Sequence, residues 1–368
     1  QRRNLLATLL LSQGTPMPTL TIEPIGETVE VAPGQTLLDA CLRAGVWLPH
    51  ACGHGLCGTC KVEVLEGEVD HGGASPFALM DFERDDGKTL ACSAMLMSDA
   101  VIEADVDEDE DARRITVDDH VGLVERREMI TPDILALWLR LDGPGLDFQA
   151  GQYVNLRLPG IEGARAFSIA SSPAEPNLIE LHVRRVPGGA GTAWLHDELK
   201  TGDRLDFTGP MGRFYVRRSA EKPLIFLAGG SGLSSPKSMI LDLLEQGYSE
   251  PITLLHGGRR PCDLHFSDLF RRLEAEHDNF RYVPAVSQPE ADDVWDGETG
   301  YVHEAAERLF EGRFSGCQAY LCGPPPMIEA GVTALMKGRL FERDIFMERF
   351  LTAGDAEASA RSPLFRKI

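Results

Sequence analysis

The stretch "ACGHGLCGTCKVEV" at residues 51–64 places three cysteines, Cys52, Cys57 and Cys60, within nine positions. Glycines stand between them, so the segment is a tight loop rather than part of a helix or strand. A disulfide framework is typical of short secreted domains, and this chain has 368 residues, eight cysteines and no convincing secretory signal. We therefore expect these cysteines to bind a metal or to carry electrons.

The spacing of the cysteines distinguishes between the two metal classes. A zinc site usually shows two pairs of close ligands, whereas this loop has the pattern C-x4-C-x2-C. The next cysteine along the chain is Cys92, in "TLACSAML", which completes the spacing of a plant-type [2Fe–2S] site. We predict that Cys52, Cys57, Cys60 and Cys92 bind a [2Fe–2S] cluster, with zinc as the alternative.

The glycines of the loop and the flanking segments agree with a small compact domain. Gly53, Gly55 and Gly58 would let the loop curl around an anionic cluster with its N–H groups aimed at sulfur. Strands "TLTIEP" and "ETVEVAP" meet at Gly26 and predict a hairpin. The segment "TLLDACLRAG" predicts a helix capped by Thr36 and ended by Gly45.

Charge is distributed unevenly along the chain. The total is −21, which argues against a nucleic-acid partner. Residues 17–111 contain 20 acidic and 4 basic residues, a net charge of −16, so the rest of the chain carries −5. This asymmetry fits electrostatic steering toward a partner, and a merely soluble surface explains it equally well. Seven acids in residues 103–111 predict an extended linker.

The first residues differ from the rest of the chain. The apolar run at residues 5–11 is too short for a membrane span and lacks a clean cleavage site. A strand-like pattern begins only after Met17. We expect residues 1–16 to lie outside the fold, and we expect no membrane association.

The middle of the chain predicts a small antiparallel barrel. Runs such as "YVNLRL" and "AFSIA" are broken by Gly and Pro, as in short paired strands. Further on, "VPGGAGTAWLHDEL" places Gly188, Gly189 and Gly191 before Thr192 and a helical pattern. A glycine-rich turn with a threonine cap at a helix start is typical of an anion site, although most such turns only connect elements.

From Pro223 onward, strands alternate with helices, which predicts a parallel sheet with ligands at the carboxyl ends of its strands. The loops "GGSGLSSP" and "CGPPPM" both fall at such ends. We expect Ser235 to cap the following helix, Pro236 to stand in its first turn and Gly247 to end it.

One feature of this half bears on the choice of dinucleotide. The usual fold places an acidic residue after the second strand to hold the ribose hydroxyl, but here "LLHGGRRPCD" offers Arg259 and Arg260. The spacing alone therefore does not choose between NAD and NADP.

Near the C-terminus, Glu342 and Asp344 are expected to be solvated charges at a helix end.

The order of these motifs resembles the reductase components of bacterial multicomponent oxygenases, in particular those of phenol hydroxylases. The resemblance covers residues 17–368 and rests on the cysteine loop and on "ASPFALMDFER", "RAFSIAS", "AGGSGLSSPKSMILDLL", "AYLCGPPPMI" and "RLFERDIFMERF". It implies three domains: an α+β ferredoxin domain of the β-grasp type, an antiparallel β-barrel for FAD, and an α/β parallel-sheet domain for NAD. The expected bounds are 17–105 for the ferredoxin domain, 106–116 for an acidic linker, 117–218 for the barrel and 219–368 for the NAD domain with its C-terminal tail.

The resemblance also implies roles for single residues. In the barrel, Arg165 would pair with the flavin pyrophosphate, Phe167 would lie along the flavin ring in place of the commoner tyrosine, and Ser168 would bond near flavin N5. The remaining expected flavin contacts are His182, Val183, Gly189, Gly191 and Thr192. The expected contacts of the nicotinamide dinucleotide are Gly229, Gly230, Gly232, Arg259, Cys322, Gly323 and Pro324. Ser168 and Cys322 would take part in the chemistry. The loop "GGSGLSSP" is one residue longer than the commoner form.

The function implied by this resemblance is electron transfer from NADH to FAD, then to [2Fe–2S], and finally to the di-iron oxygenase component of a phenol hydroxylase. The protein would act in the cytoplasm. Two alternatives keep part of this scheme: the same path serving another aromatic oxygenase or a deoxysugar dehydratase, or a redox sensor. The sequence leaves the oligomeric state open.

Overall fold

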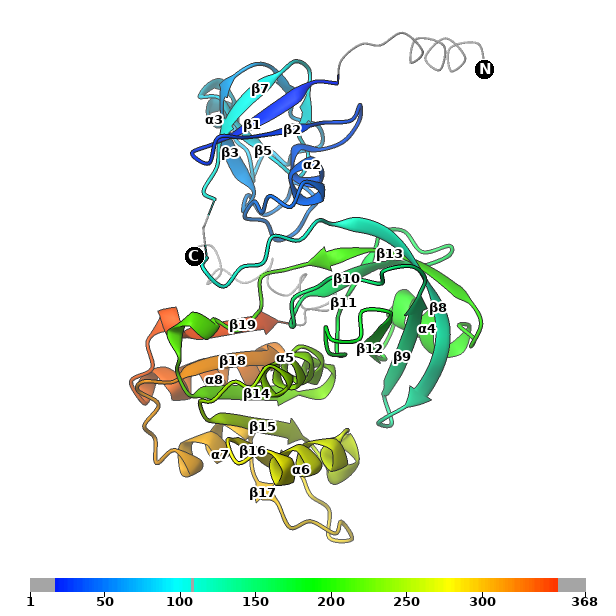
Figure 1. Cartoon of the computed structure of the whole chain (residues 1–368), viewed down its shortest axis with the longest axis vertical. Coiled ribbons are helices and arrows are strands. Elements are labelled where there is room, and N and C mark those ends of the chain that lie inside the picture. Colours follow the sequence, from blue (N-terminus) through cyan, green and yellow to red (C-terminus); the bar gives the residue numbers. More distant parts are fainter. Residues whose placement is uncertain (1–16, 107–108, 350–368) are drawn as a thin grey trace. The chain divides into compact units, whose positions relative to one another are not determined.

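The computed structural model describes residues 17–106 and 109–349 (Figure 1). The chain forms two compact units, and the boundary between them along the sequence lies between Val117 and Asp118. The expected N-terminal extension at residues 1–16 lies outside the described residues. In the part that is described, no helix is both long and apolar enough to cross a membrane.

The first unit is built on a five-stranded mixed sheet in the order β2-β1-β7-β3-β5, beside a small pair β4-β6. Two helices accompany these strands, α2 (Leu37–Arg43) and α3 (Asp81–Asp85). The strands are β1 (Thr19–Glu23), β2 (Glu27–Glu30), β3 (Lys61–Glu66), β4 (Val69–Asp70), β5 (Lys88–Leu90), β6 (Met95–Leu96) and β7 (Ala100–Glu103).

Local sequence signals set the first elements of this unit. Strands β1 and β2 form the predicted antiparallel hairpin, with Gly26 in the left-handed region at φ 66°. Thr36 caps α2 by accepting a hydrogen bond from the Asp39 N–H at 3.3 Å. Gly45, at φ 75°, ends the helix as predicted, and the next N–H, of Val46, bonds back to the Cys41 carbonyl at 2.8 Å.

The segment after the acidic run packs back onto the first unit. Arg114 donates to the Ala44 carbonyl at 3.2 Å and pairs with Glu27. The Val117 N–H donates to the Leu42 carbonyl at 3.1 Å. These contacts explain why the compact unit extends to Val117, beyond the strands of its sheet.

The second unit begins with a six-stranded antiparallel barrel in the order β11-β10-β13-β8-β9-β12, nearly closed by a bridge between Ile169 and Leu181. Leucines, valines and phenylalanines of alternating strand positions fill its core. One helix, α4 (Ala190–Asp197), follows β12. The barrel strands are β8 (Asp118–Met129), β9 (Ile134–Leu141), β10 (Tyr153–Arg157), β11 (Arg165–Ser168), β12 (Leu178–Arg184) and β13 (Arg204–Met211).

The rest of the second unit is the predicted parallel sheet, in the order β17-β16-β15-β14-β18-β19. Its strands are β14 (Leu224–Gly229), β15 (Ile252–Gly258), β16 (Phe280–Val286), β17 (Glu298–Thr299), β18 (Gln318–Gly323) and β19 (Ile345–Arg349). Its helices are α5 (Ser234–Glu245), α6 (Ser267–Glu276), α7 (Val302–Leu309) and α8 (Pro325–Lys337).

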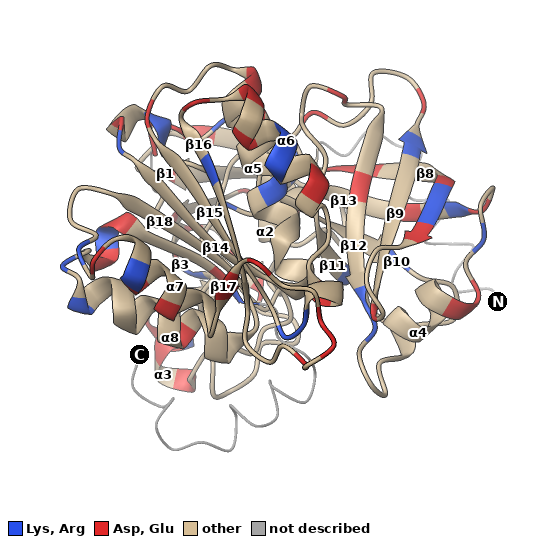
Figure 2. Ribbon diagram, turned by 90° about the horizontal axis from the view of Figure 1, so that it is seen from below, with Lys and Arg blue, Asp and Glu red and all other residues tan. Residues whose placement is uncertain are grey.

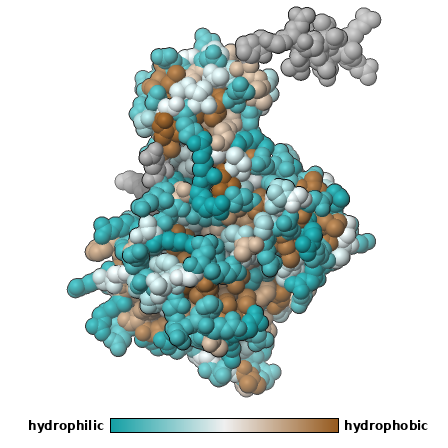
Figure 3. Space-filling model, in the orientation of Figure 1, coloured by the Kyte–Doolittle hydropathy of each residue, from teal (hydrophilic) through white to brown (hydrophobic). Residues whose placement is uncertain are grey.

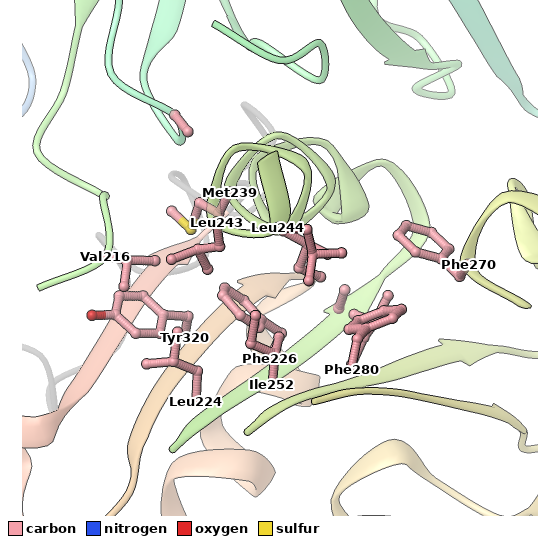
Figure 4. Packing of buried hydrophobic residues seen from close by; sticks show 14 of the residues in the cluster. Val216, Leu224, Phe226, Met239, Leu243, Leu244, Ile252, Phe270, Phe280 and Tyr320 are labelled. Carbon is pink, nitrogen blue, oxygen red and sulfur yellow. The ribbon is translucent and has the colours of Figure 1, made fainter. Parts of the chain in front are cut away.

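Two apolar layers hold the helices on this sheet. Figure 4 shows one of them: Met239, Leu243 and Leu244 of α5 lie over Phe226 and Tyr320 of the sheet. The other layer packs α7 and α8 against the opposite side of the same strands. Side chains of one strand alternate between the two layers, which is why these strands are apolar along their whole length.

The termini of α5 confirm one expected cap and correct another. Gly247, at φ 71°, ends the helix as predicted, and the Tyr248 N–H bonds back to the Leu243 carbonyl at 2.9 Å. Ser235 does not cap it, because the helix already begins at Ser234 and the position before it is Leu233. The Ser235 hydroxyl is thereby free to bond elsewhere, as described below.

A buried ion pair joins the barrel to the parallel-sheet half. The Lys237 ammonium of α5 lies 2.7 Å from the Glu180 carboxylate of β12 and donates to the Ala170 carbonyl at 3.0 Å. Burial raises the pKa of Glu180, but the hydrogen bond from His182 and the charge of Lys237 outweigh burial and lower it to about 2. Because a buried charge is costly unless it is paired, this contact fixes how the two halves meet.

Candidate electron-transfer sites

The four predicted cysteine ligands come together in the first unit as two pairs. The Cys57 thiol donates to the Thr59 hydroxyl at 3.2 Å and also bonds with Cys52; although burial raises the pKa of Cys57, hydrogen bonds with these two residues lower it to about 7. Burial, together with the adjacent Cys60 thiol, raises the pKa of Cys92 to about 12. In the described residues, no three side chains converge on one point as around a single ion. Two pairs suit a binuclear cluster, which takes two protein ligands on each iron.

Backbone N–H groups of the loop point at the sulfurs. The Gly55 N–H lies 3.2 Å from Cys92 Sγ, and the N–H groups of His54 and Leu56 each lie 3.4 Å from Cys52 Sγ. These are the donors that an anionic cluster needs, and they are already in place.

The three glycines of the loop have the predicted freedom. Gly53, Gly55 and Gly58 have φ values of 68°, 74° and 77°, all in the left-handed region. A Cβ at Gly55 would lie 3.2 Å from Ala74 Cα, and one at Gly58 would lie 3.3 Å from the Ala78 carbonyl. Gly53 meets no atom within 4 Å. The loop therefore packs tightly against residues 74–78 at Gly55 and Gly58.

One edge of the cysteine loop is open to solvent. Cys57 is exposed, whereas Cys60 and Cys92 are buried. Leu56 is 66% exposed, and Phe77, in the segment packed against the loop, is 91% exposed. Hydrophobic side chains are visible on the surface of this unit in Figure 3. Exposed apolar side chains beside an electron-transfer group indicate a surface that another protein covers.

The predicted flavin-phosphate residues meet at one end of the barrel. Arg165 begins β11, and a Cβ on Gly191 would lie 3.2 Å from Arg165 Cγ. Thr192 does not cap α4 as expected, because the position before the helix is Gly189. Its hydroxyl instead accepts from the Val186 N–H at 3.0 Å and donates to the Gly189 carbonyl at 3.2 Å, which fixes the turn. A guanidinium beside a helix start fits a pyrophosphate.

The other barrel residues point in different directions. Phe167 is half-buried at the edge of the barrel core. Val183 is fully buried in that core, whereas the neighbouring His182 side chain faces the opposite way. His182 donates from Nε2 to Glu180 at 2.7 Å and stacks on Phe266. Residues next to each other on a strand face opposite sides, so these two side chains cannot line one ligand; any flavin contact they share is through the backbone.

The glycine loops after β14 and β18 approach each other closely. A Cβ on Gly232 would lie 2.4 Å from the Cys322 carbonyl oxygen, and one on Gly323 would lie 3.0 Å from the Gly229 carbonyl oxygen. Gly230 has φ 58°. Pro324 stands at the start of α8. Glycine alone allows this approach, and it leaves the backbone accessible at the carboxyl edge of the sheet, where dinucleotides bind.

A carboxyl group that the sequence analysis missed connects these loops to the barrel. Glu348 of β19 accepts hydrogen bonds at Oε2 from the hydroxyls of Ser168 and Ser235, each at 3.0 Å. The Cys322 Sγ lies 3.7 Å from the same oxygen. Burial raises the pKa of Glu348, and the bonds from these three groups only partly oppose that shift. Burial likewise raises the pKa of the Cys322 thiol, so it stays protonated.

No local signal marks Glu348 in the sequence. It stands in "IFMER", where it looks like any charge near the end of a chain. Only the pairing of β19 with β18, in which Glu348 lies beside Cys322, brings it to the site. Asp344 was misjudged in the same region: it is buried rather than solvated, and its carboxylate lies 2.6 Å from Lys222.

Three family models match successive parts of the chain. The 2Fe-2S iron-sulfur cluster binding domain matches residues 20–97, the oxidoreductase FAD-binding domain matches 122–215, and the oxidoreductase NAD-binding domain matches 226–332.

Similar proteins match over nearly their whole length. The phenol 2-monooxygenase reductase component DmpP of Pseudomonas sp. (strain CF600) is 59% identical over 95% of this chain and 99% of its own. The phenol hydroxylase P5 protein of Acinetobacter pittii (strain PHEA-2) is 55% identical over the same shares. The chain belongs to the family of oxygenase reductase components. Among solved structures, the Amycolatopsis reductase GcoB has a TM-score of 0.81 at 37% identity, covering 92% of this chain and 100% of that one.

As an oxygenase reductase component, the protein uses NADH, FAD and a [2Fe–2S] cluster, as predicted. The flavin supplies the conversion from a two-electron donor to a one-electron carrier. The described residues fit all three groups: paired thiols with N–H donors for the cluster, Arg165 beside α4 for FAD, and the paired glycine loops for NADH. The contacts assigned to single residues at these sites stay predictions. Beside the glycine loops the chain contributes the Glu348 carboxyl group, hydrogen-bonded by the buried Ser168 and Ser235 hydroxyls and with its pKa raised by burial.

Proposed function

We propose that this reductase passes electrons from its [2Fe–2S] cluster to the di-iron oxygenase component of a phenol hydroxylase. One observation carries the choice of acceptor. The two phenol hydroxylase reductases are 59% and 55% identical to the chain, whereas the aromatic O-demethylase reductase subunit of Amycolatopsis sp. (strain ATCC 39116 / 75iv2) is 41% identical over a similar length.

The structure supports the first unit as the part that meets the acceptor. Its exposed Leu56 and Phe77 lie at the open edge of the cysteine loop. The same unit carries exposed acids, among them Asp85 at the end of α3 and Asp86 directly after it. The second unit carries both signs of charge, as α6 shows with its blue and red segments in Figure 2. A basic acceptor surface with an apolar centre would complement the first unit and be steered to it.

In the described residues the eight cysteines form no disulfide, and the four outside the predicted cluster ligands, Cys41, Cys262, Cys317 and Cys322, are free thiols. Free thiols are typical of a reducing compartment, which supports the proposal that the protein acts in the cytoplasm.

The deciding experiment is NADH-driven phenol hydroxylation with a purified phenol hydroxylase oxygenase and limiting reductase. Turnover should fall as salt rises, because salt screens steering over a Debye length of about 10 Å at 0.1 M. Stopped-flow reduction of FAD by NADH within the same reductase should change much less. Equal salt sensitivity of both rates would mean that the acidic surface serves only solubility.

A pair of matched variants distinguishes charges that guide docking from charges elsewhere on the surface. Asp85→Asn with Asp86→Asn removes two exposed charges from the first unit and should lower turnover at low salt by about twofold or more. Glu198→Gln with Asp206→Asn removes two exposed charges from the second unit and should leave turnover near the wild-type value. Product formation with the O-demethylase oxygenase but not with the phenol hydroxylase would reject the proposed acceptor.

A further inference from the structure

The two arginines after β15 are both occupied by carboxylates of the chain itself. Arg259 lies with Nε 3.2 Å from the Asp263 carboxylate. Arg260 makes a two-point contact with Asp293, from Nε at 3.2 Å and from Nη2 at 2.7 Å. Its Nη1 lies 2.8 Å from Glu290, and Nη2 lies 3.8 Å from Asp292.

The carboxylates that hold Arg260 come from one acidic loop, residues 287–293, between β16 and β17. Backbone bonds place this loop directly beside the arginines: the Ser287 N–H donates to the Gly258 carbonyl at 3.0 Å, and the Gln288 N–H donates to the Arg259 carbonyl at 2.7 Å. The Glu290 N–H donates to Asp293 at 2.8 Å, which fixes that carboxylate toward Arg260. Asp293 is itself mostly buried, with 13% of its side chain exposed.

This position is the one that distinguishes the two dinucleotides in sheets of this kind. The end of the second strand faces the adenosine ribose, where an acid binds a free 2′-hydroxyl and an arginine accommodates a 2′-phosphate. The sequence offers arginines, which by themselves favour the phosphate. A guanidinium binds carboxylate and phosphate through the same fork of N–H donors, so it cannot serve both at once.

We propose that the acidic loop makes this reductase selective for NADH by occupying Arg260, the group that would otherwise bind the 2′-phosphate of NADPH. Two arginines face four carboxylates here, Asp263, Glu290, Asp292 and Asp293, which leaves a local charge of −2 at neutral pH. A 2′-phosphate would have to displace Asp293 and approach the remaining acids. The selectivity thus depends on exclusion rather than on a contact with the hydroxyl.

The test compares two adenosine ligands that differ only at the 2′ position. Calorimetry on the holoenzyme would measure the Kd of adenosine 2′,5′-bisphosphate and of 5′-AMP. In the variant Glu290→Gln/Asp292→Asn/Asp293→Asn, the ratio of the two Kd values should shift toward the bisphosphate by about tenfold, the effect of one charge-assisted contact. The ratio of kcat/KM for NADPH to that for NADH should rise with it.

Two further variants show whether Arg260 is the group released. Adding Arg260→Ala to the triple variant should remove the gain, and adding Arg259→Ala should leave most of it. A gain that survives Arg260→Ala would reflect only the lost negative charge and would overturn the proposal, as would no gain at all. If the triple variant loses FAD or unfolds, Asp293→Asn alone gives the same comparison with a smaller gain. No acceptor protein is needed, so the result is independent of the proposed oxygenase partner.

Discussion

The cysteine loop of the first unit and the Glu348 cluster of the second handle charge in opposite ways. The loop surrounds its thiols with N–H donors and leaves Cys57 exposed. In the Glu348 cluster, the Ser168, Ser235 and Cys322 side chains are buried and Glu348 is partly buried, and burial raises the pKa of its carboxyl group. A group that passes single electrons to another protein needs an accessible edge. A group beside a hydride acceptor gains from the exclusion of water, because hydrogen bonds and charges act more strongly there.

The largest effect is expected from removing a cluster ligand of the cysteine loop. Cys57→Ser removes one of four thiolate ligands, so iron analysis should show loss of the cluster, and turnover with a protein acceptor should fall to background. FAD reduction by NADH, followed by stopped-flow absorbance, should stay close to wild type, because Cys57 belongs to the other compact unit. Loss of both activities would show that the two units depend on each other to fold.

An intermediate effect is expected from replacing Glu348 in the second unit. Glu348→Ala leaves Ser168, Ser235 and Cys322 without their shared acceptor and should slow FAD reduction by about tenfold to a hundredfold. Glu348→Gln keeps an oxygen acceptor at the same place and should slow it less. Similar rates for both variants and the wild type would show that Glu348 has no part in the reaction.

The pH dependence of Glu348 can be tested separately. Its raised pKa means that it binds a proton more tightly in the folded state than in the unfolded state. Its stabilising effect is therefore full at low pH and is lost as pH rises through the folded-state pKa. The free energy of unfolding of the wild type, relative to Glu348→Gln, should fall over that range, and the pH profile of FAD reduction should be flatter in the variant. A difference that grows with pH would contradict the raised pKa.

The smallest effect is expected from adding a methyl group at single glycines of the cysteine loop. Gly55→Ala and Gly53→Ala both place a side chain at positive φ, at a cost of about 1–2 kcal/mol. Only at Gly55 does the new Cβ also meet backbone, 3.2 Å from Ala74 Cα. Loss of the visible cluster absorbance in urea should therefore occur at a lower midpoint for Gly55→Ala than for Gly53→Ala. Equal midpoints would mean that residues 74–78 do not support the loop.

The sequence by itself determined the features whose physics is local. Four cysteines at fixed spacing, three glycines able to take positive φ, and the caps at Thr36, Gly45 and Gly247 were predicted because neighbours in the chain decide them. Alternation of strands and helices likewise predicted the parallel sheet, since strand period and apolar runs follow from which faces are buried. The flavin and nicotinamide assignments depended on resemblance of whole motifs rather than on spacing.

Tertiary structure alone decided the partners of buried and paired charges. Ser235 and Thr192 are residue types that often cap helices. Because α4 and α5 begin before these residues, their hydroxyls bond to other partners. Glu348 becomes part of a site only through the register of β19 on β18, and Arg260 is occupied only because a loop more than 25 residues away in sequence returns beside it. A charged side chain looks the same in sequence whether water or another charge surrounds it. Its pKa and its role follow from that environment, which only the packing of distant segments creates.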